Sequence, residues 1–86
     1  MWIILTYDIN EKRVNDVRKI CRPYLRWVQN SVFLGDISWV DFKILQEKLS
    51  SKIIYEEDSI LIFIGRDSKL FKRVTIGTAK EFTNII

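Results

Sequence analysis

The amino-acid sequence predicts one α+β domain in which two helices cover one face of a four-stranded sheet. Two apolar runs, residues 2–8 and 59–65, are rich in strand formers. Between and beside them, apolar residues recur at helical spacing in two segments. The chain has 86 residues, so residues 1–86 make a single domain with one hydrophobic core.

Strands that are apolar on both faces usually lie in the middle of a sheet and run parallel. Residues 2–8 and 59–65 are therefore expected to be the central, parallel pair. Residues 26–34 and 70–76 mix apolar and polar side chains, which predicts outer strands. The layers are those of a ferredoxin-like sandwich. In the ferredoxin-like fold the elements follow in the order β-α-β-β-α-β, which requires two strands before the second helix. The sequence shows one strand there, residues 26–34, and does not decide whether a second one follows.

The helices are predicted from caps and from apolar stripes. Asn10 is placed to cap the first helix, and Pro23 should end it near residue 22. The apolar stripe of this helix is Val14, Val17, Cys21 and Tyr24. Ser38 opens the second helix, with Asp41 three residues on as an imperfect capping box. Its predicted buried face is Val40, Ile44, Leu45 and Leu49.

The sheet face away from the helices is expected to need a partner. Alternation along residues 26–34 puts Trp27 and Phe33 on that face and Val28, Val32 and Leu34 toward the helices. Since 48% of the residues are hydrophobic, a homodimer with the two sheets face to face would bury this surface. Residues 78–86 are predicted to form an extra strand that pairs with the partner subunit; the alternative is a frayed terminus.

Several kinds of chemistry are excluded by composition. Cys21 is the single cysteine, so no intrachain disulfide forms, and the chain has no histidine to serve as its base. The apolar start is too short for a signal peptide or a membrane span, which predicts a cytoplasmic protein without a membrane partner.

Asp8 directly follows the first apolar strand and is the main candidate for a functional residue. A divalent cation such as Mg²⁺ takes oxygen ligands, commonly one or two carboxylates with several waters. A two-fold axis near the strand end would bring a second Asp8 from another copy of the chain. The alternative is that Asp8 caps the turn at Ile9 and Asn10 that leads into the first helix.

Basic side chains collect on or beside the first helix. The net charge of the chain is +3, and Arg18, Arg22 and Arg26 are spaced to share one helical face. Such a face suits contacts to nucleic-acid phosphates, which give affinity without reading sequence. The alternative is a solvated helix face with Glu11 and Asp16 as local partners.

Three motifs together resemble the CRISPR-associated protein two family, the small partner of the integrase in spacer acquisition. They are Leu5-Thr6-Tyr7-Asp8-Ile9, Gln29-Asn30-Ser31-Val32-Phe33-Leu34-Gly35 and Asp58-Ser59-Ile60, and the resemblance covers nearly the whole chain. It implies a ferredoxin-like homodimer whose C-terminal strand commonly crosses to the partner. Tyr7 and Asp8 match the strand-end pair of the family, and Ser31 and Phe33 match the second-strand motif.

The resemblance also implies functional residues. Asp8 matches the aspartate that is associated with a divalent metal and with nuclease activity on RNA or DNA in some members. Arg13 matches a frequent helix-one arginine, while Trp27 stands where many members have an arginine and Arg26 lies one place early. In the family's adaptation complex, the dimer bridges integrase dimers and holds duplex DNA along basic surfaces. The expected function is therefore a CRISPR adaptation subunit, with an Mg²⁺-dependent endonuclease activity at Asp8 left open.

Two other functions are alternatives to this one. A free-standing ribonuclease toxin resembling virulence-associated protein D would share the fold and the early aspartate. An RNA-recognition-like binding module is disfavoured, because residues 60–64 lack the paired aromatic side chains that stack bases.

Overall fold

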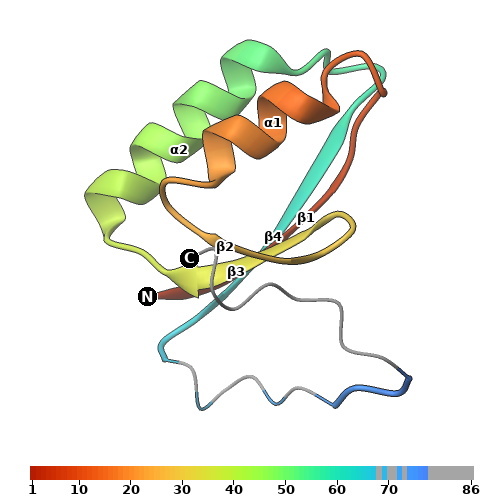
Figure 1. Cartoon of the computed structure of the whole chain (residues 1–86). Coiled ribbons are helices and arrows are strands. Elements are labelled where there is room, and N and C mark those ends of the chain that lie inside the picture. The colour runs from red at the N-terminus through yellow and green to blue at the C-terminus, as the bar shows by residue number, and fades with distance from the viewer. Residues whose placement is uncertain (68, 70–71, 73, 78–86) are drawn as a thin grey trace.

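The structure, a computed structural model, describes residues 1–67, 69, 72 and 74–77. The elements follow in the order β1 (Trp2–Asp8), α1 (Val14–Cys21), β2 (Arg26–Gln29), β3 (Val32–Asp36), α2 (Trp39–Lys52) and β4 (Ser59–Gly65). The strands form one sheet in the order β2-β3-β1-β4 with antiparallel neighbours. Both helices cover the same face of it (Figure 1). The fold is the predicted ferredoxin-like α+β sandwich.

The segment 26–34 contains a hairpin, which the sequence had left open. Asn30 and Ser31 join β2 to β3, and Asn30 takes a φ of 42°. Asparagine tolerates this left-handed conformation better than most residues, so a tight reversal forms inside an otherwise extended segment. The element order is therefore β-α-β-β-α-β, and the simpler interpretation of 26–34 as one strand is wrong.

The predicted parallel pairing of residues 2–8 with 59–65 is also wrong, because β1 and β4 are antiparallel neighbours. The hairpin supplies the reason. It reverses the chain once, so β3 runs antiparallel to β1. The crossover through α2 then returns the chain in the direction of β3, which makes β4 antiparallel to β1 as well.

Helix α1 has the predicted apolar stripe but starts later than predicted. Val17 and Cys21 are fully buried, and Val14 and Tyr24 pack partly buried against the core. The side-chain oxygen of Asn10 accepts a hydrogen bond from the backbone N–H of Lys12 at 3.0 Å, so it caps the turn that precedes the helix.

Helix α2 begins as predicted but turns a different face to the core. Ser38 Oγ accepts a hydrogen bond from the backbone N–H of Asp41 at 3.1 Å. The buried residues are Phe42, Leu45 and Leu49. Val40 and Ile44, which were predicted to be buried, are 69% and 38% exposed. The stripe through Leu45 and Leu49 continues to Phe42, three residues earlier, whereas Val40 lies off that face.

The two faces of the sheet were assigned the wrong way round at β3. Phe33 is fully buried on the helix side, opposite Leu5 in the register, and Trp27 pairs with it and packs against the core. The predicted inward set, Val28, Val32 and Leu34, is only partly buried. The core consists of Ile3, Leu5, Tyr7, Val17, Cys21, Leu25, Phe33, Ile37, Phe42, Leu45 and Leu49.

The face away from the helices is apolar and open in the single chain. Strand alternation puts Trp2, Ile4 and Leu34 there, each partly buried. Leu61 and Phe63 of β4, on the same face, are 55% and 51% exposed. We call these five residues the open sheet face.

The predicted strand 70–76 and the predicted C-terminal strand 78–86 fall largely or wholly outside the described residues. The described members of the former, residues 72 and 74–76, are not in a strand. In the described part of the chain, no helix is long and apolar enough to cross a membrane.

Candidate functional site

Asp8 is the last residue of β1 and is exposed. Its register partner is Ser59, the first residue of β4, so a carboxylate and a hydroxyl lie side by side at this end of the sheet. Alternation with the buried Tyr7 turns the Asp8 side chain toward the open sheet face. Among the described residues, Asp8 has no hydrogen bond or ion pair through its carboxylate.

The capping role considered for Asp8 is performed by Asn10. Besides the side-chain hydrogen bond to Lys12, the carbonyl oxygen of Asn10 accepts a hydrogen bond from the backbone N–H of Arg13 at 2.9 Å. The N–H groups of Lys12 and Arg13 in this turn are thereby bonded without Asp8. The capping explanation for Asp8 therefore finds no support in the described part of the chain, and its carboxylate faces solvent.

Tyr7 joins the end of β1 to the β2–β3 hairpin. Its hydroxyl donates to the carbonyl oxygen of Asn30 at 3.0 Å, and its backbone N–H donates to the carbonyl oxygen of Ser31 at 3.1 Å. Its ring lies 6.1 Å from the ring of Phe33, centroid to centroid. The motif residues Tyr7, Ser31 and Phe33 thus support the strand end next to Asp8 from inside the protein.

Arg18 also contacts Tyr7 and so helps to hold the end of β1. Its Nε donates to the Tyr7 hydroxyl at 2.9 Å, so the guanidinium of α1 reaches the strand end through Tyr7. Because Tyr7 and Asp8 point to opposite faces of the sheet, Arg18 lies behind Asp8, on the helix side. It is partly buried, which leaves part of its guanidinium at the surface.

A second carboxylate near this end of the sheet, Asp58, is buried inside the protein, with a side chain that is 0% exposed. Arg13 binds it with two hydrogen bonds, from Nε at 2.6 Å and from Nη2 at 3.0 Å. The backbone N–H groups of Asn10 and Ile54 donate to it at 2.9 and 2.8 Å. Sequence reasoning gave Asp58 no role beyond its motif. The signal that was available is its position, directly before the apolar run of residues 59–65.

Asp58 and Arg13 each stabilise the charged form of the other and so shift its pKa. Hydrogen bonds from Arg13 hold the pKa of Asp58 well below its ordinary value, with the backbone N–H groups acting in the same direction and burial opposing them. Asp58, and after it Glu57, raises the pKa of Arg13. Arg13, predicted to contact nucleic acid, is thus engaged within the chain: its side chain is 13% exposed and also bonds Glu57 at 3.0 Å.

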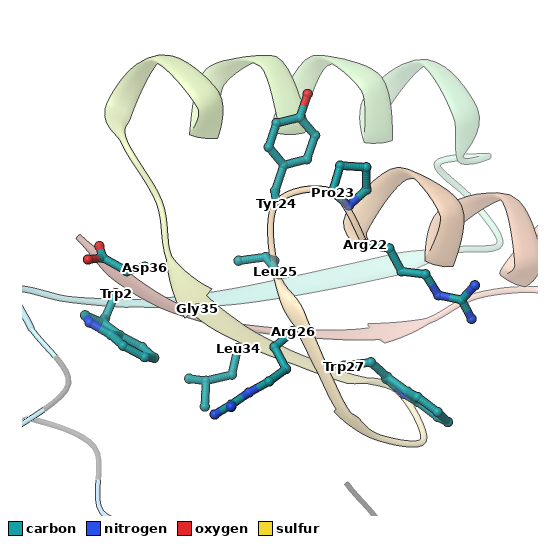
Figure 2. Close-up of a pocket in the computed structure, with 10 residues that line it drawn as sticks. All are labelled: Trp2, Arg22, Pro23, Tyr24, Leu25, Arg26, Trp27, Leu34, Gly35 and Asp36. Carbon is teal, nitrogen blue, oxygen red and sulfur yellow. The ribbon is translucent and has the colours of Figure 1, made fainter. Parts of the chain in front are cut away.

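Arg22 and Arg26 line a groove of about 620 Å³ at the opposite end of β1 from Asp8. Figure 2 shows Arg26 and Leu34 projecting from the strands away from the helices, and Tyr24 projecting toward α2. The other lining residues are Trp2, Pro23, Leu25, Trp27, Gly35 and Asp36. The four predicted arginines therefore do not form one surface.

The described residues offer limited means of holding a metal. They contain no group of three or more His, Cys, Asp or Glu side chains placed to bind one ion. Asp8 supplies one exposed carboxylate and Ser59 one hydroxyl, which are oxygen donors of the kind that Mg²⁺ prefers. A second copy of the chain could supply its own Asp8 as a second carboxylate.

Cys21 has the structural role that was predicted. It is fully buried on α1, and burial raises the pKa of its thiol to about 12. A thiol with that pKa is protonated at neutral pH, so it is not a nucleophile.

Comparison with known proteins gives a consistent result. The model of the family described as CRISPR associated protein Cas2 matches residues 1–73. A protein of Dictyoglomus turgidum named CRISPR-associated endoribonuclease Cas2 is 39% identical over 81 residues, which are 94% of this chain and 93% of that protein. A protein of Thermotoga maritima with the same name is 41% identical over 80 residues, 93% of this chain and 92% of the relative.

Solved structures agree with the sequence matches. A crystal structure described as that of cas2 superposes with a TM-score of 0.83 at 39% identity, covering 100% of this chain and 97% of the other. Streptococcus pyogenes Cas2, solved at pH 6.5, gives a TM-score of 0.78 at 31% identity and covers 90% of this chain and 100% of its own.

Proposed function

The chain belongs to the Cas2 family of CRISPR-associated proteins, and on that premise we propose that it is a dimeric nucleic-acid-binding subunit of spacer acquisition whose Asp8 also supports divalent-metal-dependent cleavage of nucleic acid. The observation that carries the cleavage proposal is the contrast between two aspartates at one end of the sheet. Asp58 is buried and fully used by hydrogen bonds, whereas Asp8 is exposed and lacks any partner among the described residues. The names of the relatives, endoribonuclease, agree with this activity.

A second copy of the chain would complete the site. The described residues bring together no group of three or more His, Cys, Asp or Glu side chains, and magnesium sites in proteins commonly use one or two carboxylates. The Asp8 side chain and the open sheet face lie on the same side of the sheet. A two-fold axis through that face, near the end of β1, would bury Leu61 and Phe63 and bring two Asp8 carboxylates toward each other. The homodimer is supported by this shared location of the apolar surface and the carboxylate.

The chemistry of such a site follows from the side chains present. A bound Mg²⁺ would polarise the phosphoryl group and lower the pKa of its water. Asp8 would hold the cation, and Tyr7 and the hairpin it binds keep the Asp8 backbone in place. The chain has no histidine, so no histidine acts as general base or acid.

Nucleic-acid binding is proposed for the cationic side chains that remain accessible, chiefly Arg22 and Arg26, with Arg18 contributing. Arg22 is exposed and Arg26 is partly buried in the groove of Figure 2. Their guanidinium groups suit duplex phosphates, on DNA or RNA. Bridging of integrase dimers by the Cas2 dimer is part of the same proposal and is supported by family membership alone.

Asp8→Asn tests the cleavage proposal, because it removes the charge and keeps the shape. We expect it to abolish Mg²⁺-dependent cleavage of single-stranded RNA and of duplex DNA while spacer integration with the integrase persists. Asp16→Asn is the matched control, since Asp16 is an aspartate of α1 that pairs on the surface with Lys52 at 3.2 Å. Cleavage that survives Asp8→Asn, or that needs no divalent cation, would refute the assignment.

A further inference from the structure

We propose that Asp58 is a positioning residue for Asp8: the buried carboxylate fixes the backbone on both sides of the exposed one. This inference rests on the proposed role of Asp8 as a cation ligand. Asp58 itself is buried and does not touch the cation or the nucleic acid. Its contribution is to keep the end of β1 in one conformation.

The carboxylate of Asp58 gathers three separate segments. Oδ1 accepts from the backbone N–H of Asn10, in the loop after β1, and from Nη2 of Arg13, in the turn before α1. Oδ2 accepts from Nε of Arg13 and from the backbone N–H of Ile54, in the loop after α2. Four hydrogen bonds satisfy both oxygens. Because three of these bonds span 45 or 48 residues of sequence, they hold the loops against each other.

Asp58 is linked to the neighbourhood of Asp8 in two ways. The bonded amide of Asn10 lies two residues after Asp8, and Asp58 itself precedes Ser59, which is the register partner of Asp8. The last residue pair of the β1–β4 ladder, Asp8 and Ser59, is therefore anchored on both strands by the buried side chain of Asp58. Strand ends otherwise fray, and a ligand on a frayed end binds a cation more weakly because it must first be ordered.

A neutral isostere should break this arrangement. In Asp58→Asn one carboxylate oxygen becomes an NH₂ group, which donates and cannot accept. Oδ1 and Oδ2 each face an N–H of the backbone and an N–H of Arg13, so either orientation of the amide sets donors against donors. Arg13 also loses the negative charge that its partly buried guanidinium faces. Glu57→Gln is the matched control, because Glu57 is 51% exposed and bonds the same Arg13 from the surface.

The experiment is a titration with Mn²⁺, followed by electron paramagnetic resonance, at a temperature well below unfolding of every variant. Groups that do not touch a metal but orient its ligands typically contribute about tenfold to a hundredfold to the metal affinity. We therefore expect Asp58→Asn to weaken Mn²⁺ binding by at least about tenfold. Glu57→Gln should change it by less than about threefold. Leu45→Ala, a core variant in the middle of α2 that makes no hydrogen bond to Asp58, should lower thermal stability and leave the Mn²⁺ affinity unchanged.

The outcomes separate this inference from the proposed function. If Asp8→Asn abolishes Mn²⁺ binding and Asp58→Asn leaves it unchanged, the positioning role is wrong. If Asp8→Asn has no effect, the proposed metal site is wrong, and amide hydrogen exchange then tests the positioning alone: faster exchange at Asn10 and Asp8 in Asp58→Asn supports it, and unchanged exchange overturns it. Should Asp58→Asn not fold, Arg13→Lys, which keeps the charge and loses the two-pronged contact, is measured in the same way.

Discussion

Replacing Phe33 by alanine removes the largest fully buried side chain among the residues that the structure describes. Phe33 lies opposite Leu5 in the register and beside the ring of Tyr7. Because a rigid core closes only partly around the space left, such a change typically costs about 3–5 kcal/mol of unfolding free energy. A chain of 86 residues has roughly 4–13 kcal/mol in all, from about 0.05–0.15 kcal/mol per residue.

The cost of Phe33→Ala is thus a large share of the total stability. For a domain of this size each kcal/mol lowers the melting temperature by about 4–8 °C, so we expect a fall of at least about 12 °C. Urea unfolding followed by tryptophan fluorescence measures the free energy. The titration is run at several protein concentrations, because dimerisation would make the stability depend on concentration.

Phe63→Ala is the matched control, a phenylalanine on a strand of the same sheet but on the open sheet face, 51% exposed. It should lower the unfolding free energy of the isolated chain by about 1 kcal/mol or less. Any larger loss of stability should depend on protein concentration, because it would come from the dimer. A loss under about 1 kcal/mol for Phe33→Ala, together with a larger concentration-independent loss for Phe63→Ala, would show that the sheet faces are assigned in reverse.

Three further predictions concern charge and capping. The pKa of Asp58 is lowered in the folded state, so the ionised carboxylate stabilises the fold fully above the ordinary carboxyl pKa of about 3.9. This contribution is lost as the pH falls below that value. The difference in unfolding free energy between wild type and Asp58→Asn, measured from urea midpoints, should therefore narrow from pH 6 to pH 3. A constant gap would contradict this. Ser38→Ala removes the cap of α2 and should cost about 1 kcal/mol in the same assay, whereas Ser38→Asp should restore most of it. Duplex affinity should fall steeply with salt, and Arg22→Gln with Arg26→Gln should flatten the slope by about two units on a log–log plot; an unchanged slope would exclude these arginines as phosphate contacts.

The sequence by itself determined the elements whose evidence is local. The apolar runs 2–8 and 59–65 form strands, Ser38 caps α2, and the Val17 and Cys21 stripe packs α1. These follow from side chains a few residues apart, so periodicity and capping chemistry suffice. The family was also identifiable, because the Tyr7-Asp8 strand end and the motif around Ser31 are short and contiguous.

Only the tertiary structure decided how those elements face one another. A hairpin at Asn30 reversed the direction of β3, and with it that of β4 relative to β1. Period-two alternation correctly put Trp27 and Phe33 on one face but could not say which face meets the helices, since both faces of the strand carry apolar residues.

For Asp8, too, the sequence determined the position and the tertiary structure decided the surroundings. The sequence put a lone carboxylate at the end of a strand, and capping was as good an explanation as function. The structure shows that Asn10 caps the turn before α1 without Asp8, and that Asp58, 50 positions later in the chain, bonds the loop behind Asp8 through Arg13 and two backbone amides. Contacts between residues so far apart arise from the packing of loops, which leaves no periodic trace in a single sequence.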